Sequence, residues 1–235
     1  MNCLLSTTYF GPIQWYQKLN RFDCIIDGEE HFVKQSYRNR CIIATTQGVQ
    51  ALTVPVEHGN EEYRMKNEEL HIAKNINTSN SPLVDSSFFI LHSSFIKDIR
   101  ISDHGNWRHL HWNALKSAYG ESPFFEFYAD DIRPFFEKKW KYLWDFNWEI
   151  MEKMCELLDI DHLPLSIDDS HDAPVNTQCS KDYRMAIQPK HPQPDPDFTS
   201  KPYYQVYQQK HGFIPNLSIL DLLFNMGNEA ILYLM

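Results

Sequence analysis

A short basic segment is the part of the sequence that best fits the binding of a small anion. Lys34, Arg38 and Arg40 place three positive charges within seven residues, in a chain of 22 basic and 31 acidic residues with a formal net charge of -9. Guanidinium groups bind phosphate or carboxylate through paired hydrogen bonds. The neutral hydrogen-bonding residues between them are Gln35, Tyr37 and Asn39. The segment predicts a site for a diphosphate or carboxylate ligand; the alternative is a solvated loop or edge strand whose arginines pair with structural acids.

A histidine on a predicted helix is the candidate for proton transfer. His111 follows Trp107 by four residues and precedes Tyr119 by eight, so the three side chains lie near one helical face. An imidazole with an ordinary pKa of about 6.5 can act as a general acid or base near neutral pH. The alternative is an imidazole at the edge of the core that only hydrogen-bonds the backbone.

Other chemistries lack their usual sequence patterns. His104, His109 and His111 do not have the spacing of a metal site, and two of them point about 200° apart on one helix. Cys41 follows the basic segment, but it begins an apolar run in which a buried thiol is the simpler interpretation. The chain has neither a phosphate-binding glycine loop nor a nucleophile elbow. We therefore expect no metal and no cofactor.

Composition narrows the class of protein further. With 43% hydrophobic residues, the 235-residue chain can bury a core, and its five scattered cysteines form no C-x-x-C pair. The acidic balance argues against nucleic acid as the partner. Neither a membrane span nor a signal peptide is evident, so we expect a cytoplasmic protein. The sequence predicts no oligomeric state.

The first half of the chain reads as mostly strands. Residues 4–9 and 22–26 are predicted strands around a helix at 13–19, and residues 41–45 and 51–56 are predicted to form a hairpin. Gln47 and Gly48 supply its turn. Residues 58–87 are polar and indicate an inserted surface excursion. Strands at 88–91 and 95–101 are expected to return the chain to the sheet.

The second half reads as mostly helices. Periodic apolar residues predict a helix at 106–119, a second after Asp130 and Asp131 that breaks near 145–147, and a third ending near 158. Residues 159–198, rich in proline and aspartate, are expected to form a long irregular loop. A strand at 203–206 and a helix at 217–225 should follow, the helix having Ser218 and Asp221 at capping-box spacing and ending at Gly227.

These elements predict an α+β fold. We expect a single domain over residues 1–235, with a mixed or antiparallel central sheet and helices packed on it.

Three stretches of the chain together resemble the WbqC-like protein family. They are Tyr9-Phe10-Gly11-Pro12 with residues 14–16, the basic segment at 34–41 leading into residues 52–56, and residues 216–225 near the end. The middle helix adds Trp107, His111 and Tyr119, followed by residues 122–125. The chain departs from the family pattern at Thr7-Thr8, where members often have Gln-Pro, and at Asn228, where they often have Pro.

The resemblance implies a role in bacterial O-antigen or capsule biosynthesis. Two classes of function follow: a transferase acting on a sugar nucleotide or acyl donor, and a non-catalytic binding or assembly protein of the same pathway. In the first, His111 is the catalytic candidate, and the anionic substrate is bound by Tyr9, Lys34, Gln35, Tyr37, Arg38, Asn39, Arg40, Trp107 and Tyr119. Convergence of Arg38, Arg40 and His111 on one pocket would favour the enzyme. We expect Arg38→Ala to weaken anion binding without unfolding the protein, and His111→Ala to slow turnover.

Overall fold

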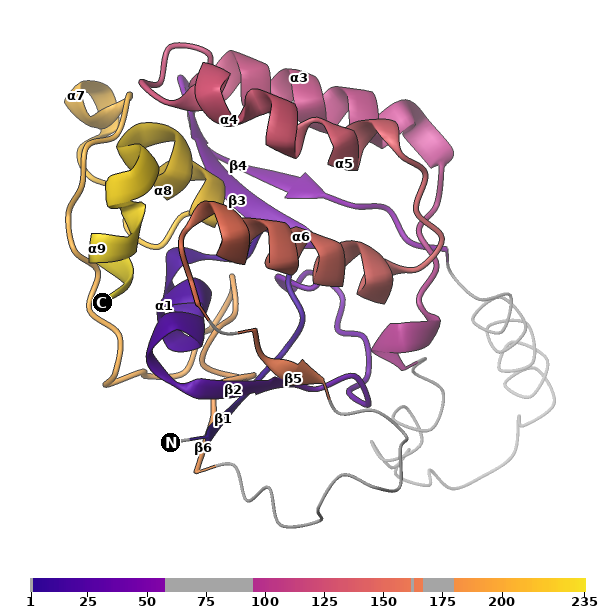
Figure 1. Ribbon diagram of the computed structural model, residues 1–235. Coiled ribbons are helices and arrows are strands. Elements are labelled where there is room, and N and C mark those ends of the chain that lie inside the picture. The colour runs from indigo at the N-terminus through magenta and orange to yellow at the C-terminus, as the bar shows by residue number, and fades with distance from the viewer. Residues whose placement is uncertain (1, 58–94, 162, 167–179) are drawn as a thin grey trace, which may run out of the picture.

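A short parallel sheet lies at one end of the molecule (Figure 1). The structure is a computed structural model that describes residues 2–57, 95–161, 163–166 and 180–235. The sheet has the order β5-β2-β1-β6, and every neighbouring pair is parallel. Its strands are β1 (Asn2–Leu5), β2 (Asp23–Ile26), β5 (Leu165–Ser166) and β6 (Lys181–Asp182). The helix α1 (Ile13–Arg21) joins β1 to β2. Such a crossover is what parallel pairing of consecutive strands requires.

An antiparallel hairpin stands apart from this sheet. Strands β3 (Arg40–Thr45) and β4 (Gly48–Thr53) pair only with each other among the described residues, with Thr45 opposite Gly48. Gly48 has a φ of 108°, a backbone conformation that residues with a side chain rarely adopt. The predicted turn residue therefore does close the hairpin.

The remaining elements are helical and cover the hairpin and the sheet. The α-helices are α3 (Trp107–Tyr119), α4 (Phe125–Ile132), α5 (Pro134–Glu137), α6 (Leu143–Leu157), α7 (Gln208–His211), α8 (Ile219–Met226) and α9 (Ile231–Leu234). Short 3₁₀ turns are η2 (Ile96–Asp98), η3 (His104–Asn106) and η4 (Gly227–Ala230). Figure 1 shows α6 running between the hairpin and the parallel sheet. Its buried face, which includes Phe146 and Ile150, belongs to the hydrophobic core.

Residues 9–16 and residues 216–225, two of the stretches that resemble the WbqC-like family, contact each other through hydrogen bonds. Ser218 Oγ donates to the Phe10 carbonyl at 2.7 Å, and the Ile219 amide donates to the Gly11 carbonyl at 2.9 Å. Asn216 accepts from the backbone amide of Gln14 at 2.9 Å. Residues more than 200 positions apart thus form one structural unit, which connects α8 to the beginning of α1.

The structure confirms an α+β protein but changes the predicted sheet. Instead of one mixed or antiparallel central sheet, a parallel sheet and a separate antiparallel pair are present. The physical reason is the α1 crossover, which makes β1 and β2 parallel and leaves the hairpin to pair with itself. The single-domain assignment stays a prediction, although one hydrophobic cluster contains residues from Cys3 to Leu234.

Several predicted elements differ in position or type. The predicted strand at 95–101 is instead η2 with isolated bridges, and residues 203–206 form no strand. Asp130 and Asp131 lie inside α4 rather than capping the next helix, and α6 continues through 145–147. The described parts of the predicted loop at 159–198 include β5 and β6. The excursion at 58–87 and the strand at 88–91 lie outside the described residues.

A buried ion pair links α1 to this late segment. Lys18 is fully buried, and its Nζ lies 2.8 Å from Asp195 Oδ2. Gln14 donates to the same oxygen at 2.7 Å, and the Tyr183 ring lies 4.6 Å from the Lys18 ammonium. Because both charges are shielded from water, each depends on the other.

Lys18→Met should therefore lower the free energy of unfolding by about 3–5 kcal/mol, since it leaves the Asp195 carboxylate buried without its cation. The measurement is urea denaturation followed by circular dichroism. The double variant Lys18→Met/Asp195→Leu should recover most of the loss, and Lys116→Met, at an exposed site of α3, should change little. A double variant no more stable than Lys18→Met alone would contradict the ion-pair account.

Candidate functional site

A small hollow lies at the carboxyl end of the parallel sheet, between β1 and β6. Ser6, Thr7 and Thr8, which follow β1, form one wall, and Tyr183 and Arg184, which follow β6, form another. The other lining residues are Leu5, Trp15, Tyr37, Arg38 and Ile187. The chain leaves β1 toward β2 on one side, while β6 lies on the other side. Open parallel sheets bind ligands at their carboxyl ends where connections diverge in this way.

Arg38 projects into this hollow from the segment that precedes β3. Its Nε donates to Glu30 Oε1 at 2.9 Å, and its Nη2 donates to Glu30 Oε2 and to Ser6 Oγ, the latter at 2.8 Å. Asn147 of α6 holds the Arg38 carbonyl at 2.7 Å. Burial raises the pKa of Glu30 in spite of the guanidinium, which lowers it. Arg38 is therefore a buried cation paired with Glu30 rather than an unpaired charge on the surface.

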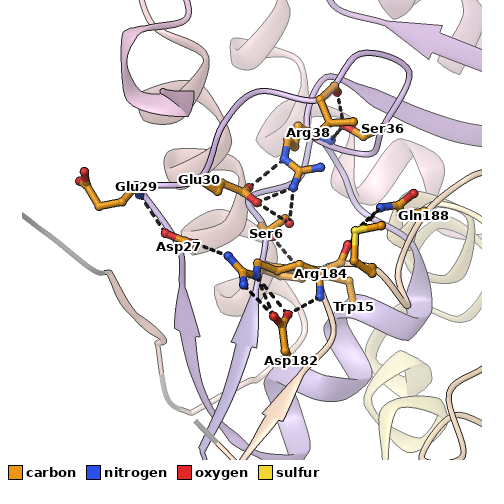
Figure 2. Close-up of polar contacts among 12 residues, drawn as sticks. Ser6, Trp15, Asp27, Glu29, Glu30, Ser36, Arg38, Asp182, Arg184 and Gln188 are labelled. Carbon is orange, nitrogen blue, oxygen red and sulfur yellow. Dashed lines mark hydrogen bonds and ion pairs between the residues drawn. The ribbon is translucent and has the colours of Figure 1, made fainter. Parts of the chain in front are cut away.

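Arg184 supplies a second guanidinium to the same hollow. It bonds both oxygens of Asp182, with Nη2 at 2.7 Å from Oδ2, and its Nη1 reaches Asp27 Oδ2 at 2.5 Å. Its side chain is 31% exposed, whereas the side chain of Arg38 is 6% exposed. Figure 2 shows Ser6 between the two guanidinium groups. Arg184 thus forms the solvent side of the site, and Arg38 forms its inner wall.

The charges of the cluster limit what it can bind. Two guanidinium groups meet the three carboxylates of Asp27, Glu30 and Asp182. An arginine has five N–H donors, and no hydrogen bond within the described part of the chain uses Nη1 of Arg38 or the second hydrogens on Nη1 and Nη2 of Arg184. The cluster thus has one more negative than positive charge, so an anion can bind through these remaining donors only if it also displaces a carboxylate.

Apart from Arg38 and Tyr37, the predicted binding residues of the basic segment lie outside the hollow. Tyr37 lines it, but Lys34 and Gln35 are exposed, and Gln35 accepts from Lys190 at 2.8 Å. Asn39 donates to the Val54 carbonyl at 2.9 Å, and Arg40 bonds Thr53 Oγ1 at 3.0 Å. These last two contacts hold the hairpin together.

The residues of the predicted catalytic face lie in the aromatic core instead. His111 is 6% exposed, and its Nδ1 is 2.9 Å from Tyr9 Oη. The Trp107 ring lies 5.2 Å from the imidazole, and Phe146 stacks on Tyr9. Tyr119 is also buried and donates to Asp221 at 3.0 Å. The predicted site residues in this core are Tyr9, Trp107, His111 and Tyr119. None of the four lines the hollow that contains Arg38.

Burial also makes His111 a weak base. Desolvation lowers its pKa from about 6.5 to about 4, and a hydrogen bond with the Thr53 backbone offsets this only in part. At neutral pH the imidazole is uncharged, and a base of such low pKa accepts a proton poorly. Catalysis by His111 stays a prediction, whereas its contact with Tyr9 is a feature of the fold.

Asp221 has a different role from the predicted one. The helix cap is made by Ser218 Oγ, which accepts from the Leu220 amide. The Asp221 carboxylate instead accepts from Tyr203 Oη at 2.6 Å and from Tyr119 Oη at 3.0 Å. Burial raises its pKa from 3.8 to about 6 in spite of these hydrogen bonds. The residue joins α8 to α3 rather than capping its own helix.

Sequence reasoning missed Asp27, Glu30, Asp182 and Arg184. The last two belong to a segment that its proline and aspartate content assigned to irregular loop. The available signal was the Lys181-Asp182-Tyr183-Arg184 run, which mixes β-forming and charged residues. Nothing local in the sequence indicates that this run pairs with β1.

Neither a metal-binding cluster nor a membrane-spanning helix occurs among the described residues. Residues 2–57, 95–161, 163–166 and 180–235 contain no group of three or more His, Cys, Asp or Glu side chains arranged to hold a metal ion. Over the same ranges, every helix is too short or too polar to cross a bilayer.

The fold and the site describe an α+β protein with a charged hollow at the carboxyl end of a parallel sheet. The model of the WbqC-like protein family matches residues 7–89, 91–188 and 175–233, so the chain belongs to this family. Comparison with curated proteins gave no match, and comparison with solved structures gave none either.

The buried Arg38 pair changes the predicted outcome of removing this residue. Arg38→Met should cost about 3–5 kcal/mol of unfolding free energy, because Glu30 is left buried and unpaired. Arg38→Met/Glu30→Met should regain most of that loss, and Arg40→Met should cost less than the single Arg38 variant. Denaturant titration checks all three. An Arg38→Met protein as stable as the wild type would restore the original expectation of a dispensable, ligand-binding arginine.

The lowered pKa of His111 predicts a stability change with pH. In the window from about 4 to about 6.5 the unfolded chain binds a proton at this imidazole and the folded protein does not, so acid favours unfolding there. Relative to His111→Gln, the wild type should lose roughly 3 kcal/mol between pH 6.5 and pH 4. Urea titrations at several pH values give this difference. Parallel curves would place the pKa of His111 near its ordinary value and support it as a proton donor.

Proposed function

We propose that this protein is a transferase of bacterial surface-polysaccharide biosynthesis, acting on O-antigen or capsule intermediates. It binds a sugar nucleotide or acyl donor by its phosphate groups at the carboxyl end of the parallel sheet. The observation that carries the proposal is that Arg38 and Arg184 line one hollow there. The family assignment supports the pathway, since the family name is tied to polysaccharide genes.

The available donor atoms indicate how a phosphate would be held. In the proposed complex, the unused N–H groups of Arg184 donate to the phosphate from the solvent side, and Nη1 of Arg38 donates from the inner side. Thr8 lines the hollow, and its buried hydroxyl has no hydrogen-bond partner among the described residues. Such a hydroxyl is stabilised by a ligand oxygen that accepts its proton. These three side chains form the proposed phosphate contacts.

Binding requires Arg184 to move. The cavity measures about 10 Å³, which is roughly the space for one water molecule. Arg184 is the exposed member of the cluster, so its side chain can swing outward while Arg38 stays fixed by Glu30. A phosphate would then exchange for one of the carboxylates that Arg184 now contacts.

His111 has an indirect role in this proposal. Its imidazole orients Tyr9, whose backbone amide donates to the Tyr37 carbonyl at 2.9 Å. Tyr37 and Thr8 line the hollow on either side of this contact. In this proposal His111 is a positioning residue rather than the proton-transfer group of the reaction.

A second candidate is a non-catalytic binding or assembly protein of the same pathway. The observation in its favour is that His111 does not line the hollow, so that Arg38, Arg40 and His111 do not converge on one pocket. Such a protein would bind the same anion and release it unchanged.

The test is a thermal-shift screen with uridine diphosphate glucose and acetyl-coenzyme A. A donor at a hundred times its dissociation constant should stabilise the protein by about 2.7 kcal/mol. Arg184→Ala should weaken that donor roughly ten- to a hundred-fold. Arg133→Ala removes an equally charged side chain between α4 and α5, outside the hollow, and should bind normally.

Two results would count against the proposal. If no donor stabilises the wild type, or if Arg184→Ala binds as well as Arg133→Ala, the hollow is not a phosphate site. If a donor binds but chromatography shows no consumption with polysaccharide precursors present, the binding protein replaces the transferase.

A further inference from the structure

A second and larger groove lies on the helical side of the molecule, between α4 and the end of α8. Its cavity measures about 290 Å³, just below the range for small-molecule sites, which starts at roughly 300 Å³. The lining residues are Phe124, Phe127, Tyr128, Asn225, Met226, Asn228 and Glu229. None of them lines the hollow at the parallel sheet, so the two sites are separate.

Two phenylalanine rings of the groove are open to solvent. Phe127 is 72% exposed and Phe124 is 37% exposed. The Phe127 ring is held edge-on against Tyr128, with ring centroids 4.8 Å apart. Exposed aromatic rings that gather in a groove are typical of ligand-binding sites. The groove therefore offers a flat apolar face to a ligand.

The backbone at Gly227 keeps this face in place. Gly227 has a φ of 57°, and a Cβ atom added there would lie 2.7 Å from the Phe124 ring. The Phe124 amide donates to the Phe224 carbonyl at 3.0 Å, which joins α4 to α8. The ring thus packs directly over a glycine, and the floor of the groove is preformed.

Polar groups beside the rings have unused hydrogen-bonding capacity. Tyr128 Oη donates to Asn228 Oδ1 at 2.8 Å, which fixes the amide and leaves its NH₂ group as a donor. Glu229 is exposed, and no hydrogen bond to its carboxylate is found within the described part of the chain. On the inner wall, the buried Asn225 Oδ1 also lacks a partner among the described residues. Donor and acceptor groups therefore stand next to an aromatic face.

The charged groups around the groove disfavour an anionic ligand. The Glu229 side chain lines the groove, and burial, followed by the carboxylates of Asp159 and Asp131, raises the pKa of Tyr128. Lys153 contacts Asp131 at 3.8 Å but lies closer to Glu156, at 2.7 Å. A phosphate or nucleotide would be repelled here, whereas a neutral molecule would not.

From these features we infer that the groove binds a neutral saccharide. The apolar C–H face of a sugar ring stacks on Phe127, and adjacent hydroxyl groups pair with the Asn228 amide and the Glu229 carboxylate. A purely apolar ligand would leave those polar groups unpaired, and an anion would meet the carboxylates. This site does not depend on the phosphate site proposed above.

Saturation-transfer NMR of the full chain with glucose, galactose and N-acetylglucosamine tests the inference. At least one sugar should receive saturation, strongest on the C–H protons of one ring face, at millimolar affinity. Phe127→Ala should weaken binding at least tenfold, which corresponds to about 1.4 kcal/mol. Phe127→Trp should retain binding, because an aromatic face is kept. Tyr204→Ala, which removes an aromatic ring that is 54% exposed outside the groove, should bind like the wild type.

Three outcomes would overturn the inference. The first is the absence of saturation transfer to all three sugars, and the second is equal binding by wild type and Phe127→Ala. The third is that adenosine binds instead of the sugars, since the groove would then hold a nucleobase. A dimer seen by sedimentation and abolished by Phe127→Ala would count in the same way, since the groove would then hold a second copy of the chain. The Arg184→Ala variant should bind the sugar normally, so failure here is distinct from failure at the phosphate site.

Discussion

The buried Arg38–Glu30 ion pair is the constraint on which the arrangement of the fold depends. Removing two charges from water costs several kcal/mol for each ion, so the pair is stable only when its hydrogen bonds are complete. Ser6 lies in the connection that follows β1, whereas Glu30 and Arg38 lie near the two ends of the connection from β2 to β3, so the pair and its Ser6 contacts join two separate connections. This cluster fixes the hairpin against the carboxyl end of the sheet, which is where the hollow forms.

The need to pair buried polar groups also explains why so few of the predicted binding residues line the hollow. Tyr9, Trp107 and His111 pack into one aromatic cluster, and their polar atoms are satisfied by each other or by the backbone. Polar groups that are buried need internal partners, and here those partners come from distant parts of the chain. Residues typical of the family thus hold the fold together, while the hollow is lined in part by residues outside the motifs.

Strong local periodicity made part of the fold predictable. The helix at α3, the hairpin turn at Gly48 and the glycine stop at Gly227 follow from spacing and from the conformational freedom of glycine. Strands of two residues, such as β5 and β6, carry no alternating pattern, so their pairing could not be predicted. The sequence also could not identify Glu30 as the ion-pair partner of Arg38, because other acidic residues nearby could equally have formed the pair. Arg184 enters the site only through the pairing of β6 with β1.

The Lys18–Asp195 contact has a consequence for synthesis of the protein. A ribosome releases Lys18 long before Asp195, and β1 likewise waits for β6 at residues 181–182. Until the late segment emerges, the early one exposes an unpaired strand edge and cannot bury its lysine. Contacts this distant in sequence slow folding and prolong the exposure of aggregation-prone surface. The parallel sheet and the Lys18–Asp195 pair can therefore be completed only after residues 181–195 have left the ribosome.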